Sequence, residues 1–251
     1  MSTELDKVYS QLLANQVPGE WLRRGFASLK PLGSWVEDLR WRVRFFELWL
    51  ERGNPYAFSL PAFFFPQVSG TTPDRVYRGI ACFSSPCNGF RCEALTAISR
   101  TSLLFCRGPQ GFLTAVLQNH ARKHAVPVNL LGFKHNFPDI LQPESHPPDG
   151  VLLYGMFIEG ASWNDVTKRL CDPRPDQIRA PAPIVHFLPE IDHKPDPADY
   201  LCPTYKTSTR RGDLSTTGIS TNFVVAVEFL TDMPVRQFIL HGAAMLLSLE
   251  S

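Results

Sequence analysis

The period of the apolar residues changes along this sequence, and the change restricts the fold more than any other feature. Within residues 34–52 apolar side chains recur at spacings of 3 and 4, which is typical of a helix with one buried face; they are Val36, Leu39, Val43, Phe46 and Leu50. After residue 149 they alternate or form short runs bounded by proline and glycine, which is typical of strands. The sequence therefore predicts an α+β fold, with an N-terminal helical segment followed by a small antiparallel, β-rich, barrel-like subdomain.

Three longer helices are predicted in the first half, and a short helix and a turn are predicted in "GEWLRRGFASLKPLG". The first covers residues 3–15 and ends before Pro18. The second covers residues 34–52, where Ser34 and Glu37 have the spacing of a capping box and Gly53 ends the helix. The third covers residues 112–124, in the stretch "GFLTAVLQNHARKHA".

The strands are predicted in the second half. A turn at Asp149 and Gly150 opens a strand of about eight residues in "DGVLLYGMFIEGASW". A short strand follows in "APIVHFLPEI", and two or three antiparallel strands are expected around a turn at Arg211 and Gly212. The stretch "PVRQFILHG" predicts one or two helical turns capped by Gly242, and "AAMLLSLE" predicts a final strand.

Residues 68–110 interrupt these patterns. They follow the aromatic stretch "FFFPQ" and show no sustained period, so they are expected to form a disordered insertion. Four of the six cysteines lie there, at Cys82, Cys87, Cys92 and Cys106. Their spacing is C-x4-C-x4-C-x13-C, which does not give the two separate ligand pairs typical of structural zinc sites. A zinc-binding protein built on this stretch stays open as an alternative that metal analysis would test.

Charge and composition argue against several classes of partner. The formal net charge of +1 gives no basis for binding nucleic acid or an anionic membrane. No apolar run approaches the roughly 20 residues that span a bilayer. The polar, acidic first residues are not a secretory signal, which indicates a cytosolic setting with reduced cysteines.

The sequence also lacks the common motifs of catalysis. It has no G-x4-G-K-[ST] loop to bind phosphates, no heptad pair for a coiled coil, and no G-x-S-x-G turn around Ser215. His120 and His124 have the i, i+4 spacing of a zinc pair, but the glutamate of H-E-x-x-H is missing. We expect an exposed basic helix end there, and no catalytic, cofactor-binding or metal-ligating residue in the sequence.

Five stretches together resemble the C-terminal domain of dynein heavy chains: "SLKPLGSWVEDL", "FFFPQ", "GFLTAVLQNHARKH", "DGVLLYGMFIEGASW" and "CPTYKTSTRRGDLSTTGISTNFV". The resemblance covers residues 1–67, as the helical part of that domain, and 111–251, as a helix plus the antiparallel β subdomain. The aromatic "FFFPQ" followed by "GFLTAVLQNHAR" is more similar to axonemal than to cytoplasmic dyneins. In the family these two stretches are adjacent, so residues 68–110 are interpreted as a retained intron translated in frame, with a lineage-specific loop as the alternative.

The resemblance implies a function that belongs to a larger protein. The parent would be a minus-end-directed microtubule motor of cilia and flagella, located in the cytoplasm and cytoskeleton at the axoneme. ATP and Mg²⁺ would bind the parent's AAA+ ring, and microtubules its stalk; dynein intermediate and light chains would be partners through the parent complex. This chain, which is expected to begin part-way into the domain, would pack on the ring as a structural and regulatory module without enzymatic activity. A stand-alone protein-binding module of the same fold is the alternative.

Five residues are candidates for docking onto the ring. Lys206, Arg210 and Arg211 would form a basic edge that faces an acidic surface. The simpler interpretation of "YKTSTRRGDLSTTG" is a strand, turn and strand whose hydroxyl groups bond the local backbone. Trp35 and Trp49 are expected to be core or interface anchors rather than ligand-stacking residues, as are Trp41 and Trp163.

Overall fold

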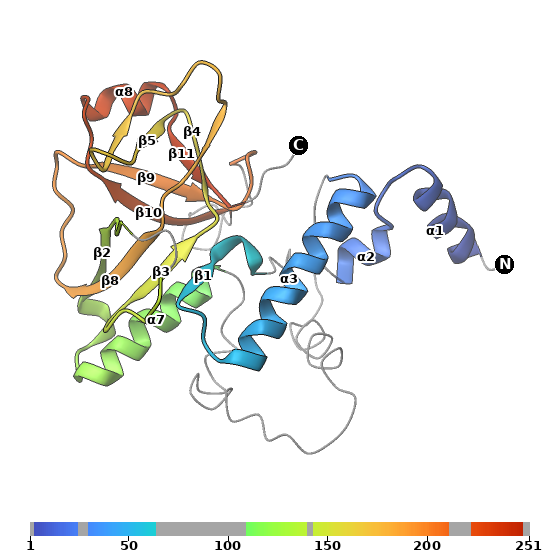
Figure 1. Ribbon diagram of the computed structural model, residues 1–251, viewed down its shortest axis with the longest axis horizontal. Coiled ribbons are helices and arrows are strands. Elements are labelled where there is room, and N and C mark those ends of the chain that lie inside the picture. The colour runs from blue at the N-terminus through green and yellow to red at the C-terminus, as the bar shows by residue number, and fades with distance from the viewer. Residues whose placement is uncertain (1–2, 25–29, 64–108, 140–142, 211–221, 248–251) are drawn as a thin grey trace. The chain divides into compact units, whose positions relative to one another are not determined.

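The computed structural model describes residues 3–24, 30–63, 109–139, 143–210 and 222–247 (Figure 1). The protein divides into two compact units. The first consists of Met1–Asn54, Ala62–Phe112 and Glu250–Ser251, and the second of Pro55–Pro61 and Leu113–Leu249. The expected insertion at residues 68–110 lies almost entirely outside the described residues, so its disorder and its origin stay predictions.

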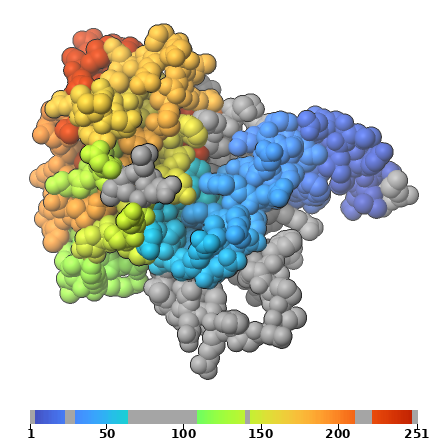
Figure 2. Space-filling view, in the orientation of Figure 1, coloured from blue at the N-terminus to red at the C-terminus, as the bar shows by residue number. Residues whose placement is uncertain are grey.

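The first unit is built from helices, drawn in blue in Figures 1 and 2. They are α1 (Thr3–Leu13), α2 (Gly19–Arg24) and α3 (Leu32–Arg52). The small core contains Val17 and Trp35, against which four half-buried side chains pack, namely Leu22, Leu32, Val36 and Leu39. Two of the predicted longer helices and the predicted short helix are therefore confirmed, and the predicted stop at Pro18 is the point where α2 begins.

The predicted capping box is wrong. Helix α3 begins at Leu32 rather than Ser34, and it has no capping side chain. Pro31 is in the extended conformation, and its carbonyl oxygen accepts the first helical bond from the N–H of Trp35 at 3.0 Å. The N–H of Leu32 donates to the carbonyl oxygen of Asn15 at 3.1 Å. A distant backbone carbonyl thus satisfies one of the four N–H groups at the helix start that have no partner within the helix.

The second unit contains two larger sheets and a two-stranded one (Figure 1, β1 in cyan and the other strands green to red). The four-stranded sheet has the order β1 (Ala57–Ser59), β3 (Val151–Tyr154), β8 (Val185–Ile191), β2 (Leu131–Asn136). The five-stranded sheet has the order β10 (Phe223–Phe229), β9 (Tyr200–Tyr205), β11 (Ala244–Leu246), β4 (Phe157–Glu159), β7 (Arg179–Pro181). Strands β5 (Ser162–Asn164) and β6 (Arg169–Cys171) form the pair.

The remaining elements are helical. Helix α7 (Pro109–His124) includes the predicted third helix, and α8 (Val235–Leu240) confirms the helical turns predicted before Gly242. Two 3-10 turns cover Leu60–Ala62 and Val128–Leu130. Among the described residues, no helix has both the length and the apolar composition that a membrane span requires.

The α+β class is confirmed, with two corrections. The strand predicted after residue 149 is divided into β3, β4 and β5, because Gly155 (φ +87°) and Gly160 (φ +75°) adopt the left-handed conformation between them. The pairs β1–β3 and β11–β9 are parallel, and the described strands form open sheets rather than a closed barrel. Strands β1, β2, β6 and β7 were not predicted, since none of them shows a clear alternation in sequence.

The core of the second unit explains the strand pattern. Along β8 buried side chains alternate with half-buried ones, and Val185 and Phe187 are completely buried. Phe229 of β10 and Phe238 of α8 are also completely buried. Burying each such side chain stabilises the fold by about 1.5–3 kcal/mol, which holds these short strands together.

Candidate docking surfaces and polar clusters

The two tryptophans predicted to dock lie in the helical unit. Trp35 is 3% exposed, and its ring stacks on that of Trp21 with the centroids 6.2 Å apart. Trp49 is half-buried, and its Nε1–H donates to Oδ1 of Asn54 at 2.8 Å. Trp35 is therefore a core residue, whereas Trp49 keeps part of its ring at the surface.

The predicted basic edge lies in the second unit. Arg210 is held within the fold, because its Nη2 lies 2.5 Å from Oε1 of Glu159 and its Nη1 donates to the carbonyl oxygen of Gly242 at 2.7 Å. Glu159 also accepts a hydrogen bond from Nε of Arg179 at 3.2 Å. Lys206 is half-buried, and this burial lowers the pKa of its amine.

Two further residues of this stretch, Arg211 and Ser215, lie outside the described residues. The contacts give Arg210 a structural role within the fold. Lys206, by contrast, forms no ion pair within the described part of the protein. The sequence did not indicate Glu159 as the partner, because 51 residues separate it from Arg210.

Helix α1 carries an exposed apolar stripe. Leu5, Tyr9 and Leu13 recur every four residues, so they lie along one face of the helix. They are 57%, 57% and 71% exposed. We call these three residues the α1 stripe. A row of large apolar side chains on one helix face is typical of a surface that another element covers.

Helix α3 also exposes large apolar side chains, at Trp41, Val43 and Leu50. The sequence had indicated apolar faces on both helices. It placed Val43 and Leu50 on the buried side of α3, whereas the structure leaves both exposed. A helix with apolar residues on several sides gives no sequence signal of which side the fold will cover.

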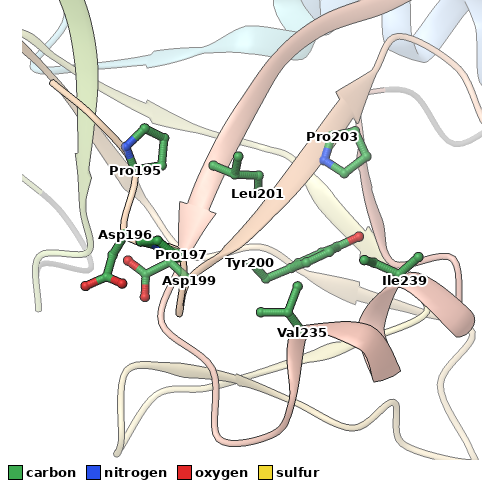
Figure 3. A pocket seen from close by; sticks show the side chains of 9 residues that line it. All are labelled: Pro195, Asp196, Pro197, Asp199, Tyr200, Leu201, Pro203, Val235 and Ile239. Atoms are coloured by element: carbon green, nitrogen blue, oxygen red, sulfur yellow. The ribbon is translucent and has the colours of Figure 1, made fainter. Parts of the chain in front are cut away.

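The second unit contains an open apolar groove with a volume of about 620 Å³ (Figure 3). Its walls come from strand β9, helix α8 and the loop between β8 and β9. The lining residues are Pro195, Asp196, Pro197, Asp199, Tyr200, Leu201, Pro203, Val235 and Ile239. Prolines fix the backbone of this loop and offer flat apolar surfaces, so the groove suits an extended or helical segment of another protein.

One end of the groove is acidic. The carboxylates of Asp196 and Asp199 lie there together (Figure 3). Burial raises the pKa of Asp199, and the negative charges of Asp196 and Glu228 raise it further, against an opposing effect of Arg169. A cationic side chain placed at this end would relieve that repulsion, so the groove favours a segment that combines apolar and basic residues.

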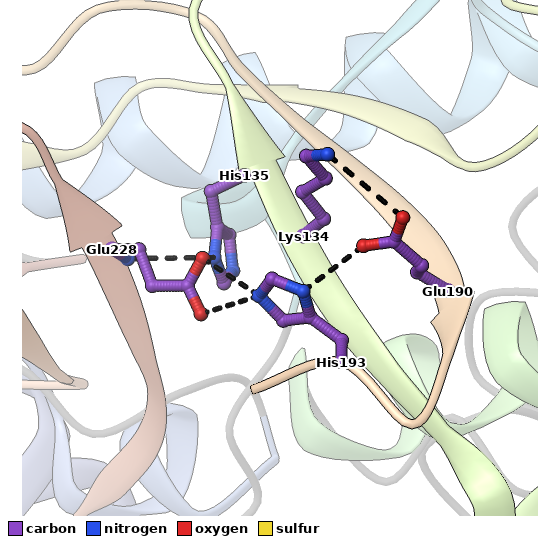
Figure 4. A network of polar contacts seen from close by, with 5 residues as sticks. All are labelled: Lys134, His135, Glu190, His193 and Glu228. Atoms are coloured by element: carbon purple, nitrogen blue, oxygen red, sulfur yellow. Dashed lines mark hydrogen bonds and ion pairs between the residues drawn. The ribbon is translucent and has the colours of Figure 1, made fainter. Parts of the chain in front are cut away.

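A histidine and glutamate network joins the two larger sheets (Figure 4). Glu228 on β10 lies 2.7 Å from Nε2 of His193, which follows β8. Nδ1 of His193 lies 3.0 Å from Glu190, which in turn pairs with Lys134 of β2 at 3.8 Å. Since these groups come from β10, β8 and β2, the network stabilises the junction between the sheets.

His135 occupies the buried side of this network. Its side chain is 3% exposed, and its Nδ1 accepts a hydrogen bond from the N–H of Glu228 at 3.4 Å. Burial lowers the pKa of His135 to about 4, although Glu228 opposes the shift. The ring is therefore neutral at neutral pH, and its Nε2 has no hydrogen-bond partner among the described residues.

His120 and His124 lie near the end of α7, as the sequence predicts, but they are not equally exposed. The side chain of His124 is 40% exposed and that of His120 only 14%. Both face Asp149, which precedes β3. The four cysteines considered as zinc ligands, Cys82, Cys87, Cys92 and Cys106, lie outside the described residues.

Comparison with known proteins decides the family. The sequence model for the C-terminal domain of the dynein heavy chain matches residues 1–68 and 102–247. The protein belongs to this family of dynein C-terminal domains. Human dynein axonemal heavy chain 6 is 36% identical over 272 residues, which include the whole of this chain and 6% of that protein. Human dynein axonemal heavy chain 3 is 34% identical over 253 residues, or 5% of its length.

A third relative, dynein axonemal heavy chain 12 of Rattus norvegicus, is 32% identical over 251 residues, which cover 7% of that protein. The chain thus spans 5–7% of the length of these relatives. The family resemblance proposed from the sequence is confirmed, as is its axonemal character. The match to the family leaves residues 69–101 uncovered, within the stretch interpreted as an insertion.

Proposed function

We propose that this chain works as a structural and regulatory module of an axonemal dynein heavy chain, a minus-end-directed microtubule motor of cilia and flagella. In this proposal it packs on the AAA+ ring of the same heavy chain. The ring binds ATP and Mg²⁺, and the stalk binds microtubules, so this chain needs no site for either. Dynein intermediate and light chains meet it only through the parent complex at the axoneme.

The observation that carries this proposal is the α1 stripe. Three large apolar side chains on one helix face, each more than half exposed, are costly to leave in water. The relatives extend far beyond the region that this chain matches, so the same heavy chain offers a large partner surface. Contact between the α1 stripe and the ring would bury this face without requiring a separate subunit.

The groove of the second unit supports the same proposal. Its apolar walls and acidic end fit a partner segment with apolar and basic residues. A module held at two separate surfaces would restrain the ring and transmit its movements. A single contact would only attach the module to the ring.

Binding to the ring tests the proposal. The AAA+ ring portion of the same heavy chain is immobilised, and its affinity for the full 251-residue chain is measured by interferometry. We expect Leu13→Glu to weaken binding at least about tenfold, because a buried apolar contact of this size contributes more than about 1.4 kcal/mol. Ser10→Glu adds the same charge to an exposed position outside the stripe, and it should change the affinity less than about twofold.

A second variant tests the groove. Ile239 is 63% exposed on α8, so Ile239→Glu should weaken binding without unfolding the protein. Wild-type affinity in both Leu13→Glu and Ile239→Glu would refute docking through these surfaces. Without the ring, the isolated chain is expected to self-associate in sedimentation experiments, and Leu13→Glu should reduce this association.

A further inference from the structure

We propose that His120, His124 and Asp149 form a binding site for a divalent transition metal, with Zn²⁺ as the best fit. The site would join the end of helix α7 to the turn that precedes strand β3. This inference concerns the second unit alone and does not rest on the proposed docking function.

The three groups converge on one point. One turn of α7 places His120 and His124 on the same face, with their ring centroids 4.2 Å apart. Oδ1 of Asp149 lies 3.2 Å from Nε2 of His124 and 3.7 Å from Nδ1 of His120. The potential ligand atoms of the three residues all lie within 4.8 Å of one another.

The two separations from Asp149 are close to those in the coordination shell of zinc. Tetrahedral Zn²⁺ binds imidazole nitrogen and carboxylate oxygen at about 2.0–2.2 Å, which places neighbouring ligand atoms roughly 3.3 Å apart. The two distances from Asp149 differ from that value by only a few tenths of an ångström. Since the ligand atoms of the three residues lie up to 4.8 Å apart, the side chains would have to rotate towards one another to complete the site.

His120 supplies independent evidence for a ligand at this position. Its Nδ1 is buried and has no hydrogen-bond partner among the described residues. An unsatisfied buried polar atom costs about 1–3 kcal/mol, so such atoms are uncommon unless they serve a purpose. Coordination to a metal would satisfy this nitrogen, which otherwise faces Asp149 at a distance too long for a hydrogen bond.

The protonation states favour coordination. Burial lowers the pKa of His120, and the nearby His124 and Lys123 add to the effect. Hydrogen bonds from Lys123 and His124 lower the pKa of Asp149 to about 2. A metal needs a neutral imidazole and an ionised carboxylate, so the directions of the pKa shifts at His120 and Asp149 both favour coordination.

Lys123 competes for the same oxygen. Its Nζ lies 2.6 Å from Oδ1 of Asp149 and donates to the carbonyl oxygen of Pro148 at 3.0 Å. Since its side chain is 57% exposed, it can turn into solvent when a metal binds. The present contact shows that a cation is already favoured at this carboxylate.

The ligand set indicates the class of metal. Imidazole suits Zn²⁺, Cu²⁺, Ni²⁺ and Fe²⁺, and two histidines with one carboxylate are found in zinc sites that keep a fourth position for water. Asp149 lies 25 residues beyond His124 in the sequence. A metal would therefore stabilise the second unit by cross-linking two segments, with an effect that grows with metal concentration.

Metal titration of the full chain tests the inference. The four cysteines at positions 82, 87, 92 and 106 are first replaced by serine, so that thiolates there cannot bind the probe. Zn²⁺ binding is followed by calorimetry, and Co²⁺ binding by its visible spectrum. We expect one Zn²⁺ per molecule, a rise in melting temperature with Zn²⁺, and a Co²⁺ spectrum of tetrahedral type without thiolate bands.

Variants separate this site from adventitious binding. His120→Ala, His124→Ala and Asp149→Asn should each weaken binding at least about tenfold, since even outer-shell partners contribute 10- to 100-fold. Lys123→Gln should preserve or strengthen Zn²⁺ binding, because this substitution removes a competing cation from Asp149. His146→Ala changes an exposed histidine outside the site and should have no effect. No stoichiometric binding by the parent protein, or equal binding by His120→Ala, would overturn the proposal.

Discussion

His135 gives a pH dependence of stability that can be calculated from the structure. The perturbation is acidification from pH 7 to pH 4.5, in the parent protein and in a His135→Leu variant. The side chain of His135 is 3% exposed between the sheets, where burial lowers its pKa to about 4 from the ordinary 6.5. The folded state therefore keeps this ring neutral over a range in which the unfolded state takes up a proton.

The sign and size of the pH effect on stability follow from the difference between the pKa of His135 in the folded and unfolded states. Above pH 6.5 the ring is neutral in both states, so its contribution to stability is fully present. As the pH falls from 6.5 towards 4, the unfolded state gains a proton that the folded state does not, and stability is lost. Each pKa unit corresponds to about 1.4 kcal/mol, so the full loss is about 3 kcal/mol.

Urea unfolding followed by circular dichroism at a series of pH values measures this loss. Other groups titrate in the same range, but they are shared by both proteins, so the difference between the two curves isolates His135. Between pH 6.5 and 4.5 the parent protein should lose more stability than His135→Leu, with the difference approaching about 3 kcal/mol. Phe133→Leu is the matched control, because Phe133 on the same strand also contacts the ring of Phe187, 5.4 Å away, but does not titrate.

The free energy of unfolding of Phe133→Leu should differ from that of the parent protein by the same amount at every pH. If His135→Leu also lost stability in parallel with the parent protein between pH 6.5 and 4.5, then His135 would titrate equally in the folded and unfolded states. That result would refute the argument that burial at the sheet junction keeps this ring neutral.

Two further pairs of substitutions test local features, again by urea unfolding. Gly150→Ala should destabilise the protein by about 2–5 kcal/mol, because φ is +76° and a Cβ would collide with a carbonyl oxygen of β8. Gly33→Ala, in α3 with open space around it, should instead stabilise by up to about 1 kcal/mol; equal effects would contradict the explanation. Arg42→Met should cost about 3–5 kcal/mol, because this buried guanidinium pairs with Asp38 at 3.1 Å and donates to the carbonyl oxygen of Phe63 at 2.9 Å. Arg44→Met, at an exposed ion pair, should cost less than about 1 kcal/mol, and a similar loss in both would argue against a specific role for Arg42.

The spacing of apolar residues was sufficient to predict the longer helices and some of the strands of this protein. The helices at α1, α3 and α7 and the strands at β8, β9, β10 and β11 were all predicted, because each has apolar residues at regular spacing. The capping box predicted at Ser34 was wrong for a different reason. An S-x-x-E pattern is a local signal, and it gave the wrong start because the backbone of Asn15, distant in sequence, approaches Leu32.

The strands at β3, β4 and β5 could not be separated from their apolar pattern alone. The residues between them, Gly155 and Gly160, read as ordinary members of a strand until their positive φ angles are known. A single sequence also does not show which strands pair in a sheet. The parallel neighbours of β3 and β11 come from distant parts of the sequence, so neither the open sheets nor their order could be predicted.

The candidate sites show the same limit. The spacing of His120 and His124 was noticed, but Asp149 was interpreted only as part of a turn. Its carboxylate belongs to the same cluster because the turn before β3 lies beside the end of α7. The groove was missed because its walls come from a loop, a strand and a helix, and its most visible sequence feature, closely spaced prolines, is also typical of simple loops.

Electron cryo-microscopy of the parent heavy chain, at a resolution that shows side chains, tests the central claim most directly. The account predicts that the region matching this sequence lies against the AAA+ ring, with Leu5, Tyr9 and Leu13 buried in the contact. A map in which this face of α1 points into solvent while the domain hangs from the ring by a linker would contradict it.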